Sequence, residues 1–345
     1  MKNISRESLF TNSFTNLFTF ILNRGTCFTF LIVPAMFFSC INTEENADYK
    51  PEHQVNSVVK SQINTLNKVE TLDAFIFEKD GKLDCYQRIT APGPSCEIAS
   101  GSGSKQILVV ANSKYDRNEW LRVKSLMSMA DIYVELEDER RDSPIMTSLF
   151  HITAGEQMSI DLLPIRSEVR LNSLRCDFSD EAYSNEPLTD IRIYLTNVNA
   201  NCSILPDEAQ NSSRFINISM LDTEHLNKFA EHDMITQSLN IVISNTATSI
   251  QRSLFCYANQ PTEESIGSPM TKLVIEGKIG GKTYYYPIKI NPRGGGIARG
   301  CRYNFDIILT RAGVTDPDCE LNEEDIEIIM EVEEWKERDG YAVSF

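Results

Sequence analysis

The chain has 345 residues, of which 41% are hydrophobic, and its formal net charge is −16 at pH 7. A surface this acidic repels phosphate backbones and anionic lipid, so nucleic acid is not an expected partner. The apolar content is sufficient to bury substantial cores, and a chain of this length favours two domains.

The first 40 residues have the layout of a secretory signal. Three basic side chains precede an apolar run from Cys27 to Phe38, which is too short to cross a membrane because a span needs roughly twenty residues. Ser39 stands directly before Cys40, and a small residue there suits the processing of a bacterial lipoprotein. We therefore predict that residues 1–40 are a signal peptide and that Cys40 carries the lipid, with plain secretion and a buried, unmodified Cys40 as the alternatives.

Residues 41–60 begin with the stretch INTEENADYKPEHQ, which is acidic and short of apolar side chains. Such a stretch cannot bury a core, so we expect a flexible tether that leads into the first strand. The first 40 residues carry three basic side chains and one acidic side chain, so the chain without them has a net charge of −18.

Short apolar segments bounded by turn residues, which are typical of strands, occupy most of the remaining chain. In its first half the expected strands are Leu72–Glu78, Lys105–Asn112 and Ile160–Leu163. Between them, Arg117–Met129 carries Trp120, Val123 and Met127 at helical spacing. This segment predicts a short helix that crosses over a sheet.

In the second half the expected strands are Val169–Leu174, Ile191–Leu195, Leu239–Ile243, Leu273–Ile279, Thr283–Ile290, Tyr303–Thr310 and Ile326–Val332. Asp222–Phe229 predicts a second short helix, which Asp222 can cap. The pair Gly280-Gly281 permits the positive φ angles of a tight hairpin. With so few helices between strands, the pattern predicts an all-β fold of antiparallel β-sandwiches rather than a parallel α/β sheet.

The stretch around Pro164 is the expected junction between two domains. Residues 61–164 are predicted to form an amino-terminal β-sandwich domain, and residues 165–345 a larger carboxy-terminal one. Both are expected to carry short crossover helices.

Seven cysteines follow Cys40, and none forms a CxxC pair, so a zinc or redox site is not expected. Cysteines of an exported protein can oxidise, and Cys85 and Cys96 would lie close together if they flanked one hairpin or loop. A Cys85–Cys96 disulfide is therefore a candidate, with buried free thiols as the alternative.

No motif in the sequence predicts catalysis, a metal or a cofactor. Gly281-Lys282-Thr283 imitates the end of a phosphate-binding loop, but Glu276 stands where that loop needs glycine, and a strand follows where it needs a helix. The four histidines lack the spacing of metal ligands, and there is no nucleophile elbow. We therefore expect a binding or assembly module and not an enzyme.

Five segments form an ordered pattern: Val69–Leu83, Gly101–Ser113, Ser143–Ser148, Ile160–Leu171 and Ile297–Asp318. The first has a strand ending in Phe before an Asp-Gly turn, the second a glycine loop and a strand closing in Val-Ala-Asn, and the last Arg299, Tyr303 and Asp316-Pro317. This order resembles the fimbrillin superfamily, the lipoprotein subunits and anchors of Bacteroidales type V pili. The chain departs from the pattern at Ile145, which separates Pro144 from Met146.

The resemblance implies two transthyretin-like sandwiches and a structural or adhesive subunit of surface fimbriae, as an anchor, accessory or tip subunit. It also implies assembly by strand exchange, in which a strand of one subunit fills a groove of the next. In shaft subunits of this family, a protease cuts after an Arg in the first-strand segment. This chain has no Arg between Cys40 and Arg88, which favours an anchor or accessory subunit; Lys50, Lys60 and Lys68 are alternative cleavage sites.

The alternating residues Tyr341, Val343 and Phe345 make the carboxy-terminal segment the candidate donated strand, with an edge strand of its own domain as the alternative. The expected partners are other fimbrial subunits, the cell outer membrane through the lipid anchor, and a ligand on a host or bacterial surface. The expected location is the outer face of that membrane.

The alternative function is a surface glycan-binding lipoprotein. Sugar rings stack on exposed aromatic side chains, so this function would need an aromatic platform. The candidates are Trp120, Trp335 and the run Tyr284–Tyr286.

Overall fold

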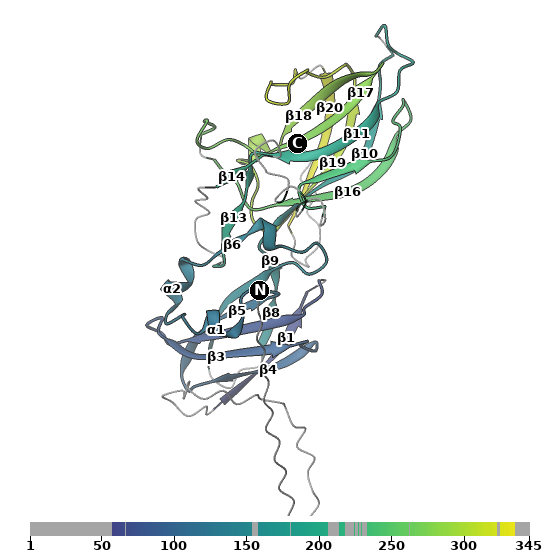
Figure 1. The fold of residues 1–345 in the computed structure, drawn as a ribbon. Helices are drawn as coiled ribbons and strands as arrows, with labels where there is room; N and C mark the ends of the chain where they lie inside the picture. Colours follow the sequence, from purple (N-terminus) through teal and green to yellow (C-terminus); the bar gives the residue numbers. More distant parts are fainter. Residues whose placement is uncertain are drawn as a thin grey trace, which may run out of the picture. The chain divides into compact units, whose positions relative to one another are not determined.

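A computed structural model describes residues 57–65, 67–153, 158–179, 181–205, 214–217, 224, 227, 229, 233–261, 263–322 and 325–334. The signal peptide with Cys40, the tether as far as residue 56, and the candidate donated strand Tyr341–Phe345 lie outside the described residues. Strands dominate the described part (Figure 1), which confirms the all-β prediction. No described helix is long and apolar enough to cross a membrane.

The first sandwich is built from two sheets. The larger sheet has the order β3-β2-β5-β7-β9, with β2 (Thr71–Phe77), β3 (Leu83–Thr90), β5 (Ser104–Ala111), β7 (Met146–Thr153) and β9 (Leu163–Pro164). The smaller sheet has the order β4-β1-β8, with β1 (Ser57–Asn64), β4 (Ser95–Ser100) and β8 (Met158–Asp161).

Side chains of the two sheets enclose a small core. In β5 the residues alternate as a strand requires, so Ile107 and Val109 point into this core while Leu108 and Val110 point to the opposite face. Ile98 of β4 contributes to the small core from the smaller sheet. The remaining members are Leu72, Ala74, Ile76, Ala111, Met146, Ile152, Ile160 and Leu162.

The second sandwich also has two sheets. One has the order β16-β10-β19-β20, with β10 (Ser167–Cys176), β16 (Thr248–Cys256), β19 (Cys301–Leu309) and β20 (Ile326–Glu334). The other has the order β15-β11-β17-β18, with β11 (Thr189–Thr196), β15 (Thr236–Leu239), β17 (Lys272–Ile279) and β18 (Lys282–Lys289).

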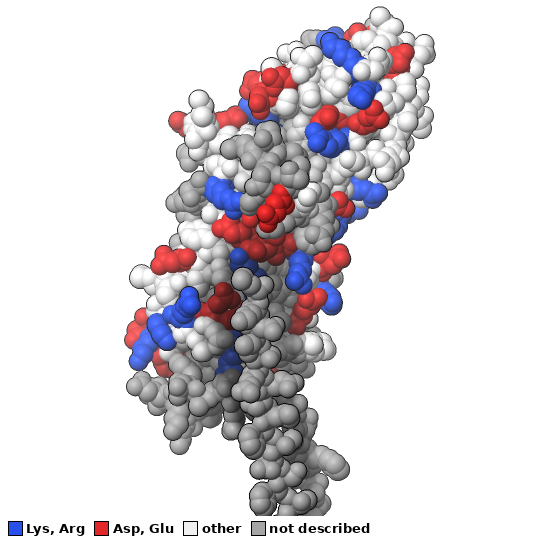
Figure 2. Space-filling model, in the orientation of Figure 1, with Lys and Arg blue, Asp and Glu red and all other residues white. Residues whose placement is uncertain are grey.

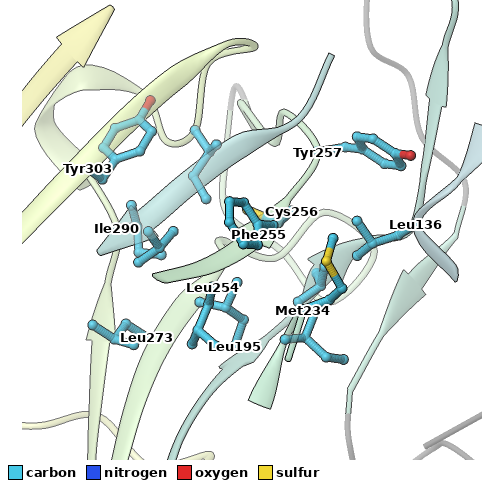
Figure 3. Close-up of a cluster of buried hydrophobic side chains, with 14 of the residues drawn as sticks. Leu136, Leu195, Met234, Leu254, Phe255, Cys256, Tyr257, Leu273, Ile290 and Tyr303 are labelled. Carbon is cyan, nitrogen blue, oxygen red and sulfur yellow. The ribbon is translucent and has the colours of Figure 1, made fainter. Parts of the chain in front are cut away.

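A larger core fills the second sandwich and continues into the outer face of the first. Leu254 and Tyr303 of one sheet and Leu195 and Leu273 of the other are buried in it (Figure 3). Phe75 and Trp120 of the first sandwich belong to the same cluster. Residues 50–345 accordingly form one compact unit, and the division near residue 165 stays a prediction.

Small elements connect the sheets. They are α1 (Arg117–Trp120), α2 (Leu126–Ala130), β6 (Tyr133–Glu135), the 3-10 turn η1 (Leu136–Asp138), β12 (Val198–Asn199), β13 (Asn201–Ser203), β14 (Phe215–Ile216) and the 3-10 turn η3 (Pro292–Gly294).

The prediction of one helix over Arg117–Met129 is wrong, because the segment forms two short helices. The first helix ends at Trp120, and Ser125, with an extended φ of −154°, accepts a hydrogen bond from the Ser128 amide and so caps the start of α2. Of the second expected helix the structure describes Glu224, Asn227 and Phe229, all of which are helical.

Most of the expected strands are present, and the hairpin at Gly280-Gly281 is confirmed, with φ values of 56° and 82°. The prediction over Leu239–Ile243 is wrong, because β15 ends at Leu239 and Ile243 instead exchanges two backbone hydrogen bonds with Leu188. Pairing is antiparallel as expected except between β1 and β8 and between β10 and β19, which are parallel.

Candidate functional site

Strand β1 lies in the middle of the smaller sheet of the first sandwich. Lys60 stands opposite Glu97 of the antiparallel neighbour β4, and Ile63 stands opposite Ile160 of the parallel neighbour β8. Both edges of β1 are therefore engaged in pairing. If β1 left the sheet, β4 and β8 would each expose an unpaired edge, which is a ready template for another strand.

On the inner face of β1 the structure describes two side chains, those of Ser61 and Ile63. Ser61 is 2% exposed, and its hydroxyl oxygen has no hydrogen-bond partner among the described residues. Ile63 is only half-buried against the same core. A strand with a buried serine gains less from the hydrophobic effect than one with a large apolar side chain, so this part of β1 is held chiefly by its backbone pairing.

Asn112, the last residue of the Val-Ala-Asn motif, ties down the loop between β1 and β2. Its side-chain amide donates to the carbonyls of Lys68 (2.8 Å) and Pro144 (2.9 Å), and its Oδ1 accepts from the amide of Glu70 (2.7 Å). Its φ of 59° is one that asparagine tolerates. The Lys68 side chain itself is 69% exposed.

Of the three candidate cleavage sites, Lys68 is therefore the one seen in an exposed loop. Lys60 lies within β1, and Lys50 lies outside the described residues. The sequence motif drew attention to Asn112, but its contact with the β1–β2 loop depends on a pairing of distant segments that no local pattern encodes.

Cys85 on β3 and Cys96 on β4 both pack against the small core as free thiols, and burial raises the pKa of each. The Gln87 side chain donates to the Glu97 carbonyl (3.2 Å) and accepts from the Ala99 amide (2.9 Å), which aligns Gln87 with the stretch around residue 98. Because β3 and β4 are consecutive strands joined by a short turn, this alignment places Cys85 and Cys96 on opposite sides of the Gln87 contact. A disulfide needs the Cα atoms of its two cysteines within about 7 Å. The Cys85–Cys96 bridge stays a prediction.

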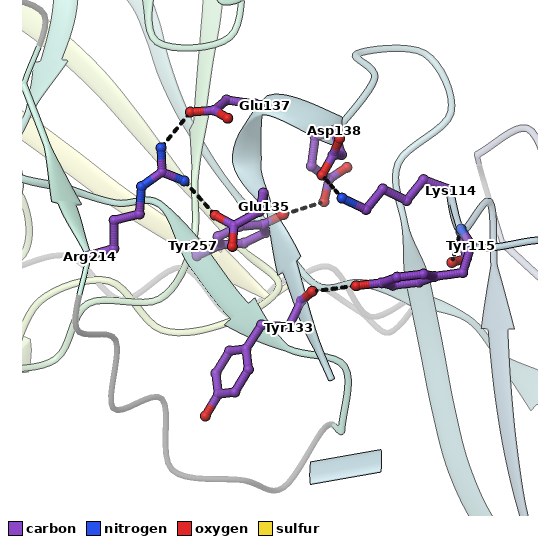
Figure 4. Close-up of polar contacts among 10 residues, drawn as sticks. Lys114, Tyr115, Tyr133, Glu135, Glu137, Asp138, Arg214 and Tyr257 are labelled. Carbon is purple, nitrogen blue, oxygen red and sulfur yellow. Dashed lines mark hydrogen bonds and ion pairs between the residues drawn. The ribbon is translucent and has the colours of Figure 1, made fainter. Parts of the chain in front are cut away.

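Charged side chains surround the segment β6–η1, where β6 pairs with β13 of the second half of the chain. Arg214 bonds both Glu135 (2.5 Å) and Glu137 (2.6 Å), as Figure 4 shows. Lys114 pairs with Asp138 on the same segment. On the face shown in Figure 2, acidic and basic side chains lie beside one another in this way, which reduces repulsion in an acidic chain.

A buried ion pair joins the same segment to the start of β10. Arg166 is 2% exposed, donates to the carbonyls of Arg140 and Arg141 (2.7 Å each), and lies 3.6 Å from the carboxylate of Glu139. Burial raises the pKa of Glu139 and lowers that of Arg166, while their mutual attraction opposes both shifts. The motif residue Arg299 makes a further link, since it bonds the Thr147 hydroxyl (2.8 Å) of β7 and the Ser203 carbonyl (3.0 Å).

Strand β20 is the edge of its sheet and pairs with β19 alone among the described strands. Ile328 and Ile329 are 40% and 63% exposed. A groove of about 420 Å³ is lined here by β20, by Phe305 and by Ile288 of β18. Among the described strands β20 is thus an edge strand, on which the exposed Ile328 and Ile329 lie among glutamates.

Trp120 does not form a sugar-binding platform, because it is 1% exposed and packs against Phe75 and Tyr115. Tyr286 is buried, Tyr284 and Tyr285 are half-buried, and Trp335 lies outside the described residues. Within the described ranges no three His, Cys, Asp or Glu side chains form a group that could hold a metal ion.

The fold is similar to that of solved structures of fimbrial proteins and putative adhesion proteins. A putative cell adhesion protein from Bacteroides eggerthii is 15% identical with a TM-score of 0.63, and the match covers 84% of this chain and 98% of that one. A fimbrilin (FimA) from Porphyromonas gingivalis is 14% identical with a TM-score of 0.59 over 81% and 97% of the two chains. The tip fimbrial protein Mfa3 from Porphyromonas gingivalis is also 14% identical, with a TM-score of 0.51 over 81% and 100%.

Residues 55–154, which contain β1 and most of the first sandwich, match the family of the major fimbrial subunit protein (FimA). No curated protein matches the sequence. The predicted resemblance to the fimbrillin superfamily is confirmed by this family match together with the fold.

Proposed function

We propose that this chain is a structural and adhesive subunit of a surface fimbria that keeps its own first strand, and so acts as an anchor or accessory subunit. The observation that carries the retention of β1 is that no Arg lies between Cys40 and Arg88, while β1 itself is paired on both edges in the middle of the smaller sheet. Other fimbrial subunits are the partners.

Strand exchange is the mode of assembly that this geometry supports. Vacating the place of β1 would uncover the pairing edges of β4 and β8 and the side of the small core that Ser61 and Ile63 face. An incoming strand could restore the backbone ladder and place larger apolar side chains on that core. A chain that keeps β1 instead offers no such groove, so it can end or anchor a fibre but cannot accept a strand there.

Retention of β1 depends on the loop that follows it. The exposed Lys68 lies in this loop, and no Arg lies between Cys40 and Arg88. A protease specific for Arg therefore has no site at which to release β1. Lipidation at Cys40 would complete the role of an anchor, because the acyl chains would hold the tether on the outer membrane.

The test is the intact mass and amino-terminal sequence of the protein recovered from the native outer membrane and from sheared surface fibres. A chain that begins at an acylated Cys40 and is present in the fibre fraction is the expected result. A chain that begins after Lys68 without lipid would instead identify a polymerising shaft or tip subunit, and absence from fibres would contradict the fimbrial role itself.

A Lys68→Gln variant provides the matched control. The anchor role predicts that this variant and the wild-type chain have the same amino terminus and the same distribution between membrane and fibres. If the wild-type chain is cut after Lys68 and the variant is not, the chain is processed, and the retention of β1 is wrong.

A further inference from the structure

A buried lysine lies between two carboxylates at one end of the small core. The Lys105 side chain is 2% exposed, and its Nζ is 2.9 Å from Oδ2 of Asp84 and 2.5 Å from Oε1 of Glu78. The Asp84 side chain is 5% exposed, whereas that of Glu78 is 38% exposed. The amine and the Asp84 carboxylate are thus shielded from water, while Glu78 remains connected to it.

The backbone aims Asp84 at this lysine. In the pairing of β2 with β3, Ile76 stands opposite Cys85 and Phe77 opposite Leu83, so Asp84 is an extra residue in a β-bulge. A bulge bends its strand and redirects a side chain. Here it directs the carboxylate of β3 across β2 toward Lys105 of β5.

A glycine lets the chain close over the pair. A Cβ atom at Gly101 would lie 2.8 Å from Oδ2 of Asp84 and 3.1 Å from Nζ of Lys105, which is too close for any other residue without a rearrangement. Oδ2 of Asp84 lies within ion-pair distance of Lys105 but accepts no hydrogen bond from the described residues. The amine therefore lies against a carboxylate oxygen that is otherwise unsatisfied.

We propose that Lys105 and Asp84 condense to form an isopeptide bond, with Glu78 as the proton relay. The ammonium of Lys105 first passes one proton to the Asp84 carboxylate, and the neutral Nζ attacks Cγ of Asp84. Glu78 takes a second proton from the nitrogen and delivers it to the departing hydroxyl, so that a C–N bond forms, a C–O bond breaks and water leaves. Glu78 ends as the carboxylate it began as, and no oxidant or other reactant is needed.

Two physical effects favour this step. Groups held in contact react as if at very high concentration, with effective molarities on the order of 10⁵–10⁸ M for well-oriented pairs. Condensation also replaces a buried ammonium and carboxylate by a neutral amide, which removes the cost of keeping both charges out of water.

The pKa of Lys105 sets the order of the steps. Burial lowers this pKa, but hydrogen bonding to Glu78 and the charge of Asp84 outweigh burial and raise it, so the proton transfer to Asp84 has to come first.

The bond would join β3 to β5 covalently across β2, which is hydrogen-bonded between them. The inference is independent of the fimbrial role, because it rests on the contacts of Glu78, Asp84 and Lys105 alone.

The test is a trypsin digest of the reduced and alkylated full-length protein, analysed by mass spectrometry. With the bond formed, trypsin cannot cut after Lys105, and the peptide 83–88 is found joined to the peptide 89–114 with the combined mass lowered by one water molecule. Recovery of peptide 83–88 in linear form, together with cleavage after Lys105, would overturn the proposal.

Three variants fix the roles of the residues. Lys105→Arg keeps a buried cation but has no amine to react, and Asp84→Ala removes the acceptor, so both should give only linear peptides. Glu78→Gln keeps both reactants and should reduce the joined peptide to a small fraction of its wild-type level. A joined peptide that persists unchanged in Glu78→Gln would overturn the relay, and one that persists in Lys105→Arg would show that a different lysine reacts.

Discussion

The two sandwiches differ in what occupies the middle of a sheet. In the second sandwich the central strands β10 and β19 carry Leu171, Tyr303 and Phe305, each at most 1% exposed in the larger core. In the smaller sheet of the first sandwich the middle strand β1 contributes a buried serine and the half-buried Ile63. The second sandwich is therefore the more firmly packed scaffold, whereas the described inner-face residues of β1, Ser61 and Ile63, bury less apolar surface.

The largest expected effect comes from the centre of the scaffold. Phe305→Ala would open a cavity in the larger core and should lower the free energy of unfolding by about 3–5 kcal/mol. Ile63→Ala is the matched truncation in β1 and should cost about 1 kcal/mol, because the side chain is only half-buried. Urea unfolding of both variants measures the difference.

Equal losses for Phe305→Ala and Ile63→Ala would contradict the comparison, because they would mean that β1 is as firmly embedded as β19. A loss confined to one of two resolved transitions would show that the sandwiches unfold separately, against the single compact unit of residues 50–345.

A similarly large effect is expected where the two sandwiches meet. Arg166→Met would leave the Glu139 carboxylate buried without its partner and should cost about 3–5 kcal/mol. In the double variant Arg166→Met with Glu139→Gln no buried charge is left unpaired, so the loss should be smaller than in Arg166→Met alone. Urea unfolding again provides the measurement, and a double variant less stable than Arg166→Met would contradict the ion-pair account.

The elements that were predictable from sequence are those whose signals are local. The β17–β18 hairpin follows from Gly280-Gly281 between two apolar runs, and β2 and β5 follow from their apolar runs. The break between α1 and α2 was missed, because the apolar periodicity continues across Ser125, whose side chain caps the start of α2. Ile241 and Val242 read as a strand but are exposed, because Ile243 pairs away from β15 with Leu188.

The candidate site was only partly predictable, because its contacts join distant segments. The resemblance implied a first strand, but Ser61 interrupts the apolar face of Val59 and Ile63 that would have set its bounds. Its parallel pairing with β8 is a tertiary contact without a local signature. The same holds for the ion pair of Lys105 with Asp84, which depends on the bulge between β2 and β3.

A smaller effect, dependent on pH, is expected at Asp73 in the first sandwich. Burial raises the pKa of this carboxyl, although the Tyr86 hydroxyl donates to it (2.7 Å) and Arg88 lies nearby. Since the pKa of Asp73 is higher in the folded state than in the unfolded state, the folded state binds the proton more tightly. Asp73 therefore stabilises the fold increasingly as the pH falls from the folded pKa to the unfolded pKa.

Asp73→Asn removes this titration. The stability of Asp73→Asn relative to the wild-type chain should therefore be more favourable at pH 7 than at about pH 4, where the wild-type carboxyl is taking up its proton. Urea unfolding of both proteins at the two pH values measures the difference. A relative stability that improves on acidification would mean that the folded pKa of Asp73 is depressed and that Arg88 outweighs burial.

The smallest effect on stability, and the sharpest on processing, is expected in the loop after β1. Lys68 is exposed and its ion pair with Glu70 is a surface pair, so Lys68→Gln should change the free energy of unfolding by less than about 1 kcal/mol.

Asn112→Ala leaves Lys68 in place but removes three hydrogen bonds that hold the loop. A lysine-specific protease should therefore cut the native variant after Lys68 faster than it cuts the native wild-type protein. The double variant should resist that cut. If Asn112→Ala is cut no faster than the wild type, the three hydrogen bonds of Asn112 do not protect the loop from the protease. Retention of β1 would then depend on the absence of a suitable protease rather than on the fold.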